Sequence, residues 1–286
     1  MRKVTLAVIL VLAAAAGAGA VVINHETKSS DATKTPSPSE SYFALGDSVA
    51  AGIGLEDPSD TSACDRTNQS YPNIVAKELN VNLSNIACSG AASSTGILSS
   101  QNVNNLAVNP QLNQLFAAPK RPMLVTLTIG ANDIGWSKTI SKCYTATCGD
   151  LADTSAIADK IVTLGTNLNS ILGKIQTNYS SDIPHVIVTN YYQVFPVKGN
   201  TCDSLSGITA DEINWWRTQQ VSLNQVISKV SLAYPFVKVA DVDFSGHELC
   251  TSDPWVQGLQ DRAPYHPTAN GQQAITKAIL AAQATF

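Results

Sequence analysis

A serine, a histidine and two blocks of small polar residues follow one another along the chain in an order that suits hydrolysis by a nucleophilic serine. Ser48 lies in the run Gly46-Asp47-Ser48, directly after the apolar stretch 42–45. A serine at the turn from a buried strand into a helix presents its hydroxyl at the carboxyl edge of a sheet, beside unpaired backbone N–H groups. Ser48 is therefore the candidate nucleophile.

Three downstream blocks could supply the other groups that this chemistry needs. They are Ala87-Cys88-Ser89-Gly90-Ala91, Thr128-Ile129-Gly130-Ala131-Asn132-Asp133 and Tyr265-His266-Pro267-Thr268. Hydrolysis requires a base for the serine proton and donors for the tetrahedral oxyanion. His266 is the expected base, because imidazole titrates near neutral pH. The expected oxyanion donors are the backbone N–H groups of Ser48 and Gly90 and the side-chain amide of Asn132.

Each block by itself has a simpler explanation. Gly-Asp-Ser and Gly-Ala-Asn-Asp are common turns after a strand, and only their order along one chain favours catalysis. Asp47 and Asp133 are expected to hold the turn backbone rather than to react. Among the remaining histidines, His247 is the rival base. Trp255, in the loop before His266, is a candidate for the wall of a substrate pocket.

Short apolar runs alternate with longer amphipathic runs along the chain. We expect strands at 41–46, 83–87, 123–129, 185–191 and 236–240, and helices at 70–80, 154–179, 209–232 and 268–283. The run 123–129 is nearly continuous in apolar β-formers, as a strand buried on both faces should be. The alternation predicts a parallel sheet with helices on both sides. Ligands of such sheets bind beyond the carboxyl ends of the strands, where Ser48, Gly90 and Asn132 would converge.

Length and charge exclude other classes of protein. The chain has 286 residues and a net charge of −4, which indicates one large domain with extensions and no basic surface for nucleic acid. We therefore expect no nucleic-acid partner. The expected partner is a small-molecule or lipid ester, the expected oligomeric state is a monomer, and membrane contact is expected only through the N-terminal segment if it is uncleaved.

The N-terminal segment indicates export. Residues 1–23 contain a basic start followed by an apolar run, and Ala18-Gly19-Ala20 suits signal peptidase. The run is also long enough to span a bilayer, so a retained signal anchor is the alternative to cleavage. The second half of the run is only weakly apolar, which favours cleavage. Residues 24–40 are polar and proline-bearing, which predicts a flexible spacer. We expect a secreted protein, or one held at the outer face of the cytoplasmic membrane if the anchor is retained.

An even number of cysteines in an exported chain indicates a disulfide framework. Six cysteines allow 15 pairings, of which the sequential one is the simplest: Cys64–Cys88, Cys143–Cys148 and Cys202–Cys250. A bridge that closes roughly 25 residues stabilises a fold by about 3 kcal/mol. A zinc site is the weaker alternative, because Cys143 and Cys148 have no second Cys or His pair at metal-site spacing. We expect neither a metal nor a cofactor.

On these blocks the chain resembles the SGNH, or GDSL, hydrolase superfamily, which is named for the Ser, Gly, Asn and His found here in that order. The resemblance covers residues 41–286. Three further runs are similar to the disulfide-bonded secreted bacterial esterases and lipases of the superfamily: Cys64-Asp65-Arg66, Ser70-Tyr71-Pro72 and Gly246-His247-Glu248-Leu249-Cys250.

The resemblance implies an α/β fold, a flavodoxin-like three-layer α/β/α sandwich with a central parallel sheet. It implies Ser48 as the acylated nucleophile, the oxyanion donors named above and the sequential disulfide pairing. A conventional α/β-hydrolase is disfavoured, because the Gly-x-Ser-x-Gly elbow of that fold is absent.

The chain departs from the superfamily pattern at one position. Most members place Asp three residues before the histidine, where this sequence has Ala263. In some secreted members that lack this Asp, the serine and the histidine form a dyad, and a main-chain carbonyl at that position orients the histidine. We therefore expect the carbonyl of Ala263 to orient His266, in a loop that Pro264 stiffens. Asp261 is the competing orienter.

Taken together, the blocks predict a secreted serine esterase or lipase that forms an acyl-enzyme on Ser48 with His266 as general base. A carbohydrate O-deacetylase or an acyltransferase would use the same groups, and the preferred acyl chain length would distinguish it from a lipase. A catalytically silent cell-surface binding protein is the third alternative. Such a protein should show a damaged block, whereas every block is intact here.

Overall fold

A five-stranded parallel sheet lies at the centre of the computed structural model, which describes residues 40–59, 63–197 and 202–286. The strands run in the order β2-β1-β5-β6-β7. Their bounds are β1 (Ser41–Gly46), β2 (Asn82–Asn85), β5 (Leu124–Thr128), β6 (His185–Thr189) and β7 (Val237–Ala240). All of β5, and all but the first residue of β1 and β6, is buried. Burial on both faces explains why these strands are nearly continuous apolar runs.

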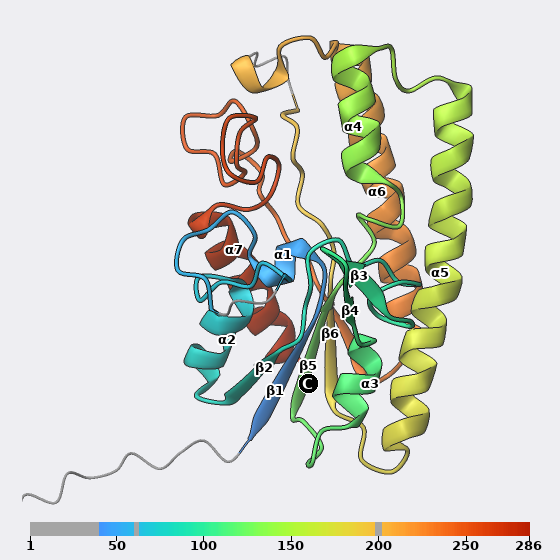
Figure 1. Cartoon of the computed structure of the whole chain (residues 1–286), viewed down its shortest axis with the longest axis vertical. Helices are drawn as coiled ribbons and strands as arrows, with labels where there is room; N and C mark the ends of the chain where they lie inside the picture. The colour runs from blue at the N-terminus through green and yellow to red at the C-terminus, as the bar shows by residue number, and fades with distance from the viewer. Residues whose placement is uncertain (1–39, 60–62, 198–201) are drawn as a thin grey trace, which may run out of the picture. The chain divides into compact units, whose positions relative to one another are not determined.

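Helices cover both faces of the sheet (Figure 1). One layer contains α2 (Tyr71–Leu79) and α7 (Ala269–Gln283), and the other contains α3 (Gln111–Phe116), α5 (Leu151–Tyr179) and α6 (Ala210–Ser231). The short helix α1 (Ser48–Ala51) follows β1, α4 (Trp136–Thr145) follows β5, and the 3-10 turn η1 (Asp203–Leu205) precedes α6. The three layers and the strand order confirm the flavodoxin-like α/β/α prediction.

The structure contains every predicted strand and helix, and adds elements that were not predicted. Three of these are α3, α4 and η1, none of which has a side-chain cap at its start, so their sequences carry no clear start signal. A further addition is the antiparallel hairpin of β3 (Gln101–Val103) and β4 (Leu106–Val108). Its strands are only three residues long, and it turns at Asn104 and Asn105, which both have positive φ.

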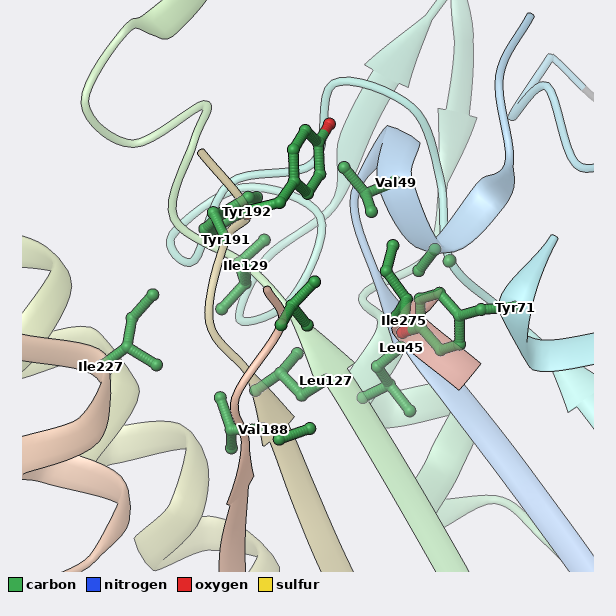
Figure 2. Close-up of a cluster of buried hydrophobic side chains, with 14 of the residues drawn as sticks. Leu45, Val49, Tyr71, Leu127, Ile129, Val188, Tyr191, Tyr192, Ile227 and Ile275 are labelled. Carbon is green, nitrogen blue, oxygen red and sulfur yellow. The ribbon is translucent and has the colours of Figure 1, made fainter. Parts of the chain in front are cut away.

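The hydrophobic core continues up to the carboxyl edge of the sheet. Figure 2 shows apolar side chains on both sides of the strands, among them Leu127, Val188 and Ile275. Buried hydroxyls within this core are paired: Tyr71 bonds Thr128 Oγ1 at 2.8 Å, and Thr128 Oγ1 in turn bonds Thr189 Oγ1 at 2.7 Å. Because each of these buried hydroxyls has a partner, the core carries them without an unmet desolvation cost.

Three disulfides join loops around this edge. They pair Cys64 with Cys88, Cys143 with Cys148 and Cys202 with Cys250, which is the sequential pattern. None of the six cysteines is free. The first bridge fixes the loop that leads from β2 toward Gly90, and the second closes the C-terminal end of α4.

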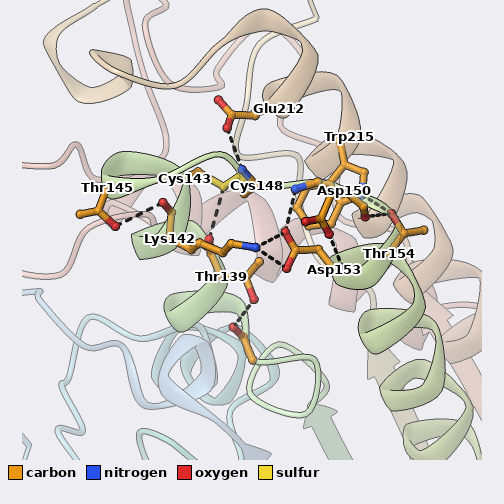
Figure 3. Close-up of polar contacts among 12 residues, drawn as sticks. Thr139, Lys142, Cys143, Thr145, Cys148, Asp150, Asp153, Thr154, Glu212 and Trp215 are labelled. Atoms are coloured by element: carbon orange, nitrogen blue, oxygen red, sulfur yellow. Dashed lines mark hydrogen bonds and ion pairs between the residues drawn. A yellow bond between two sulfur atoms is a disulfide. The ribbon is translucent and has the colours of Figure 1, made fainter.

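Polar contacts hold the end of α4 against α5 and α6 (Figure 3). Lys142 Nζ lies 2.7 Å from a carboxylate oxygen of Asp153, and the N–H of Cys148 donates to Glu212 Oε1 at 2.9 Å. The indole N–H of Trp215 donates to Thr154 Oγ1 at 2.9 Å. These contacts fix the helix that begins with Trp136, which lines the cavity described below.

None of the helices within residues 40–59, 63–197 and 202–286 combines the length and apolarity needed to cross a bilayer. The predicted signal segment 1–23, and the predicted spacer 24–40 apart from its last residue, lie outside the described residues.

Candidate active site

Ser48 is the first residue of α1 and directly follows the turn that ends β1. Asp47 caps this helix, because its carboxylate accepts the N–H of Val49 at 2.9 Å. The turn also requires glycine: Gly46 has a φ of 144°, and a Cβ there would lie 2.4 Å from the carbonyl oxygen of Thr128. The local sequence therefore brings the Ser48 hydroxyl to the carboxyl edge of the sheet.

His266 lies in the loop before α7 and contacts Ser48. Its Nε2 is 2.7 Å from Ser48 Oγ, and its Nδ1 is 3.1 Å from the carbonyl oxygen of Pro264. A carbonyl can only accept a hydrogen bond, so Nδ1 carries the proton and Nε2 is free to accept from the serine hydroxyl. Burial lowers the pKa of His266 below its usual 6.5, although the two nearby carbonyls, of Pro264 and Ala263, act in the opposite direction. The imidazole is thus neutral near pH 7.

The hydrogen bond of Nδ1 goes to the carbonyl of Pro264, one residue after the predicted Ala263, whose carbonyl also raises the pKa of the imidazole. The carbonyl of Ala263 accepts the backbone N–H of His266 at 3.2 Å and so closes a turn, in which Tyr265 has a left-handed φ of 70°. The sequence could not reveal this turn, because a tyrosine rarely adopts positive φ. The rival Asp261 is engaged elsewhere, since its carboxylate accepts the N–H of Gly258 at 2.7 Å.

The predicted oxyanion donors line one cavity together with Ser48 and His266. The cavity has a volume of about 220 Å³, and Gly90 and Asn132 both form part of its wall. Within the described parts of the chain, the backbone N–H groups of Ser48 and Gly90 have no hydrogen-bond acceptor. Asn132 Nδ2 donates to the carbonyl of Ala91 at 2.8 Å, which leaves its second hydrogen available. We call the space that these three donors border the oxyanion site.

Asp133 and its partners hold the loop that contains Gly90. The Asp133 carboxylate accepts the N–H of Ser93 at 3.0 Å and also accepts the Ser93 hydroxyl. Asn167, on α5, donates its side-chain N–H to the same hydroxyl at 2.9 Å. Burial raises the pKa of Asp133. These contacts agree with the predicted structural role for Asp133.

Tyr191, which follows β6, connects two of the blocks and was not singled out from the sequence. Its hydroxyl donates to Asp47 Oδ2 at 2.5 Å and accepts the N–H of Ala131 at 3.1 Å. Burial raises the pKa of Asp47 to about 7, while the Tyr191 bond opposes the increase. The nucleophile turn and the turn before Asn132 are thus held in register by one buried phenol.

Aromatic and aliphatic side chains complete the cavity. Trp136 from α4, Leu223 from α6 and Ile53 lie in its wall. Trp255 is not part of the wall: it stacks on His247 with ring centroids 3.6 Å apart. Nδ1 of His247 contacts the carbonyl of Asp253 at 2.8 Å, and His247 does not line the cavity either.

Within the residues that the structure describes, His, Cys, Asp and Glu side chains form no cluster that could hold a metal ion. The polar groups in the cavity wall include the Ser48 hydroxyl, the His266 imidazole and the Asn132 amide.

The sequence and the fold are similar to those of known proteins. The GDSL-like Lipase/Acylhydrolase family matches residues 44–274. Lipase 1 of Streptomyces coelicolor is 31% identical over 247 residues, which cover 82% of this chain and 83% of the relative. The crystal structure of phospholipase A1 from Streptomyces albidoflavus aligns with a TM-score of 0.71 and 27% identity over 85% of this chain and 99% of that one. The structure of the extracellular lipase from Streptomyces rimosus aligns with a TM-score of 0.65 and 26% identity over the same shares. The chain belongs to the GDSL-like lipase/acylhydrolase family and is an ester hydrolase.

Proposed function

We propose that this hydrolase cleaves carboxylic esters through an acyl-enzyme on Ser48, with His266 as the general base. The observation that carries the proposal is the 2.7 Å contact between Ser48 Oγ and His266 Nε2. As Oγ attacks the ester carbonyl carbon, Nε2 takes the hydroxyl proton and then returns it to the departing alcohol. Water then attacks the acyl carbonyl carbon while Nε2 takes one of its protons. The Oγ–acyl bond breaks, the carboxylic acid leaves, and Nε2 returns the proton to Ser48 Oγ.

The oxyanion that forms in each tetrahedral step would be stabilised by the N–H groups of Ser48 and Gly90 and the amide of Asn132. Donors fixed in place before the reaction stabilise the developing charge without reorganising, which is the largest contribution in many acyl-transfer enzymes. The Pro264 carbonyl would keep His266 in the tautomer that the first step needs. A neutral carbonyl stabilises the imidazolium less than a carboxylate does, so the dyad depends more heavily on the oxyanion donors.

The apolar cavity supports an ester with an apolar acyl or alcohol part as substrate. Side chains such as Trp136 and Leu223 border the cavity. Contact between these side chains and a hydrocarbon group would bury apolar surface, which stabilises the bound ester. The relatives named lipase and phospholipase A1 support lipid esters in particular. No cofactor takes part in this scheme.

Residues 41–286 would form the hydrolase domain of a secreted monomer. The three disulfides and the extracellular Streptomyces relative support export. Residues 1–23 would act as a signal peptide or signal anchor, and residues 24–40 as the spacer.

Hydrolysis of p-nitrophenyl esters from acetyl to palmitoyl by the full oxidised chain tests the proposal. Ser48→Ala should abolish turnover at every chain length. Ser245→Ala removes an exposed hydroxyl that does not line the cavity and should leave turnover intact. A preference for long chains indicates a lipase, and activity on acetyl alone indicates a deacetylase. An active Ser48→Ala protein would contradict the proposal.

A further inference from the structure

The peptide group between Ser89 and Gly90 is the middle of a tight turn. The N–H of Ala91 donates to the carbonyl of Cys88 at 3.1 Å, and Gly90 has a φ of 79°. Positive φ at the third residue is the mark of a type II turn. Types I and II differ by a flip of the middle peptide, which exchanges the positions of its carbonyl and its N–H. A flip here would replace the Gly90 N–H at the oxyanion site with the carbonyl oxygen of Ser89.

The side chain of Gln101 contacts this middle peptide from outside the cavity. Gln101 is the first residue of β3 and is 8% exposed. Its Nε2 donates to the Ser89 carbonyl at 2.6 Å. A Cβ on Gly90 would lie 3.4 Å from the same Nε2, and one on Gly96 would lie 2.8 Å from Gln101 Oε1. The glycine at position 96 therefore leaves the room that the amide occupies.

The orientation of this amide follows from its surroundings. Gln101 Oε1 has no hydrogen-bond partner within the described structure. Inverting the amide would place that oxygen against the Ser89 carbonyl, where two acceptors repel each other. Nε2 therefore faces Ser89, and one acceptor is left unpaired to make that contact. Within the described residues, the bond to the Ser89 carbonyl is thus the one hydrogen bond of this buried amide, which has two donor hydrogens and an acceptor oxygen.

We propose that Gln101 is a positioning residue whose hydrogen bond to the Ser89 carbonyl keeps the Gly90 N–H directed at the oxyanion site. The inference rests on the proposed role of Gly90 as an oxyanion donor. Gln101 does not line the cavity and acts through the peptide group. Its bond selects the type II form of the turn, and it polarises the peptide so that the N–H at the other end becomes a stronger donor.

The two ends of this turn have separate anchors. Cys88 is bonded to Cys64 by a disulfide, and the N–H of Ser89 donates to the Cys64 carbonyl at 3.1 Å. Asn132 holds the Ala91 carbonyl on the other side. Replacement of Gln101 should therefore leave the loop in place and change only the orientation of the middle peptide.

Gln101→Met tests this directly, because it removes the donor and keeps the length of the side chain. We expect kcat to fall roughly 10-fold or more, less than the loss on deleting a donor outright, while KM changes little. Affinity for a tetrahedral boronic acid inhibitor should fall by the same factor as kcat. Asn102→Ala, at the exposed neighbouring position on the same strand, should change neither quantity.

Gln101→Glu provides a second readout that a merely structural role would not move. A protonated carboxyl can donate to the Ser89 carbonyl, whereas a carboxylate repels it. The kcat of Gln101→Glu, divided by the kcat of the wild type, should therefore rise as the pH falls. A ratio independent of pH would overturn the inference, even if Gln101→Met failed to fold. Wild-type kcat in Gln101→Met, with Ser48→Ala inactive, would overturn the inference alone. Full activity of Ser48→Ala would overturn the proposed function and this inference together.

Discussion

Replacement of Asn132 by alanine separates the proposed oxyanion role of this residue from its structural role. The side-chain amide of Asn132 has two hydrogens, and the structure accounts for one of them in the 2.8 Å bond to the Ala91 carbonyl. The second is the proposed donor to the oxyanion. Asn132→Ala removes both hydrogens at once, so its two consequences must be measured by different assays.

The magnitudes of the two losses differ. Removing one preorganised oxyanion donor lowers kcat by about 10²–10³, which corresponds to a barrier increase of about 2.7–4 kcal/mol. Removing the partner of the Ala91 carbonyl leaves a buried acceptor unpaired, which lowers the free energy of unfolding by about 1–3 kcal/mol. Ala91 is fully buried, so water does not easily replace the lost bond.

Steady-state kinetics and urea unfolding measure these losses separately. Asn167→Ala is the matched control, because Asn167 holds the same loop through Ser93 but does not line the cavity. We expect Asn132→Ala to lose kcat and stability, and Asn167→Ala to lose stability with kcat nearly unchanged. If Asn132→Ala kept wild-type kcat, or if both variants lost kcat equally, the assignment of Asn132 as an oxyanion donor would be refuted.

Three further predictions concern titration and orientation at the site. Because burial lowers the pKa of His266, kcat/KM should fall on the acid side with a midpoint below pH 6.5, and a midpoint above 7 in a pH-rate profile would argue against a neutral base. Between pH 3.8 and about 7 the unfolded chain has released the Asp47 proton while the folded protein retains it, so this residue makes the wild type less stable as the pH rises. Urea unfolding should then show the free energy of unfolding of Asp47→Asn, relative to wild type, increasing across that window, whereas a constant difference would contradict the raised pKa. Asp261→Asn should leave kcat unchanged, because that carboxylate contacts Gly258 and not the imidazole; a loss of turnover in a folded protein would restore a triad.

Buried strands and ordered turns were the predictable part of this fold. Strands β1, β5 and β6 are apolar because both faces are covered, and a turn with glycine follows β1 and β5. Parallel strands end at one edge of a sheet, so the pattern of strands and turns alone predicts that Ser48 and Asn132 lie near each other. The position of His266 in a loop directly before a helix was predictable, because Thr268 marks the start of that helix. Thr268 caps α7 through its side chain.

The walls and supports of the site depend on tertiary packing and were not predictable. Leu223 faces the cavity only because α6 packs against α5 and the sheet, and no local pattern distinguishes it from a core leucine. Tyr191 and Gln101 make hydrogen bonds to residues distant in the sequence, Asp47 and Ser89, which no local pattern indicates. The bond from His266 Nδ1 to the Pro264 carbonyl lies in a turn where Tyr265 adopts a positive φ, which its residue type does not favour.

Covalent labelling by a fluorophosphonate tests the central claim most directly. Such a reagent forms a stable tetrahedral adduct with an activated serine, which peptide mass spectrometry can locate. We predict one adduct on Ser48 in the full oxidised chain, loss of esterase activity in proportion to labelling, and no adduct in Ser48→Ala. An adduct on another residue, or labelling of Ser48→Ala at the wild-type rate, would contradict the account.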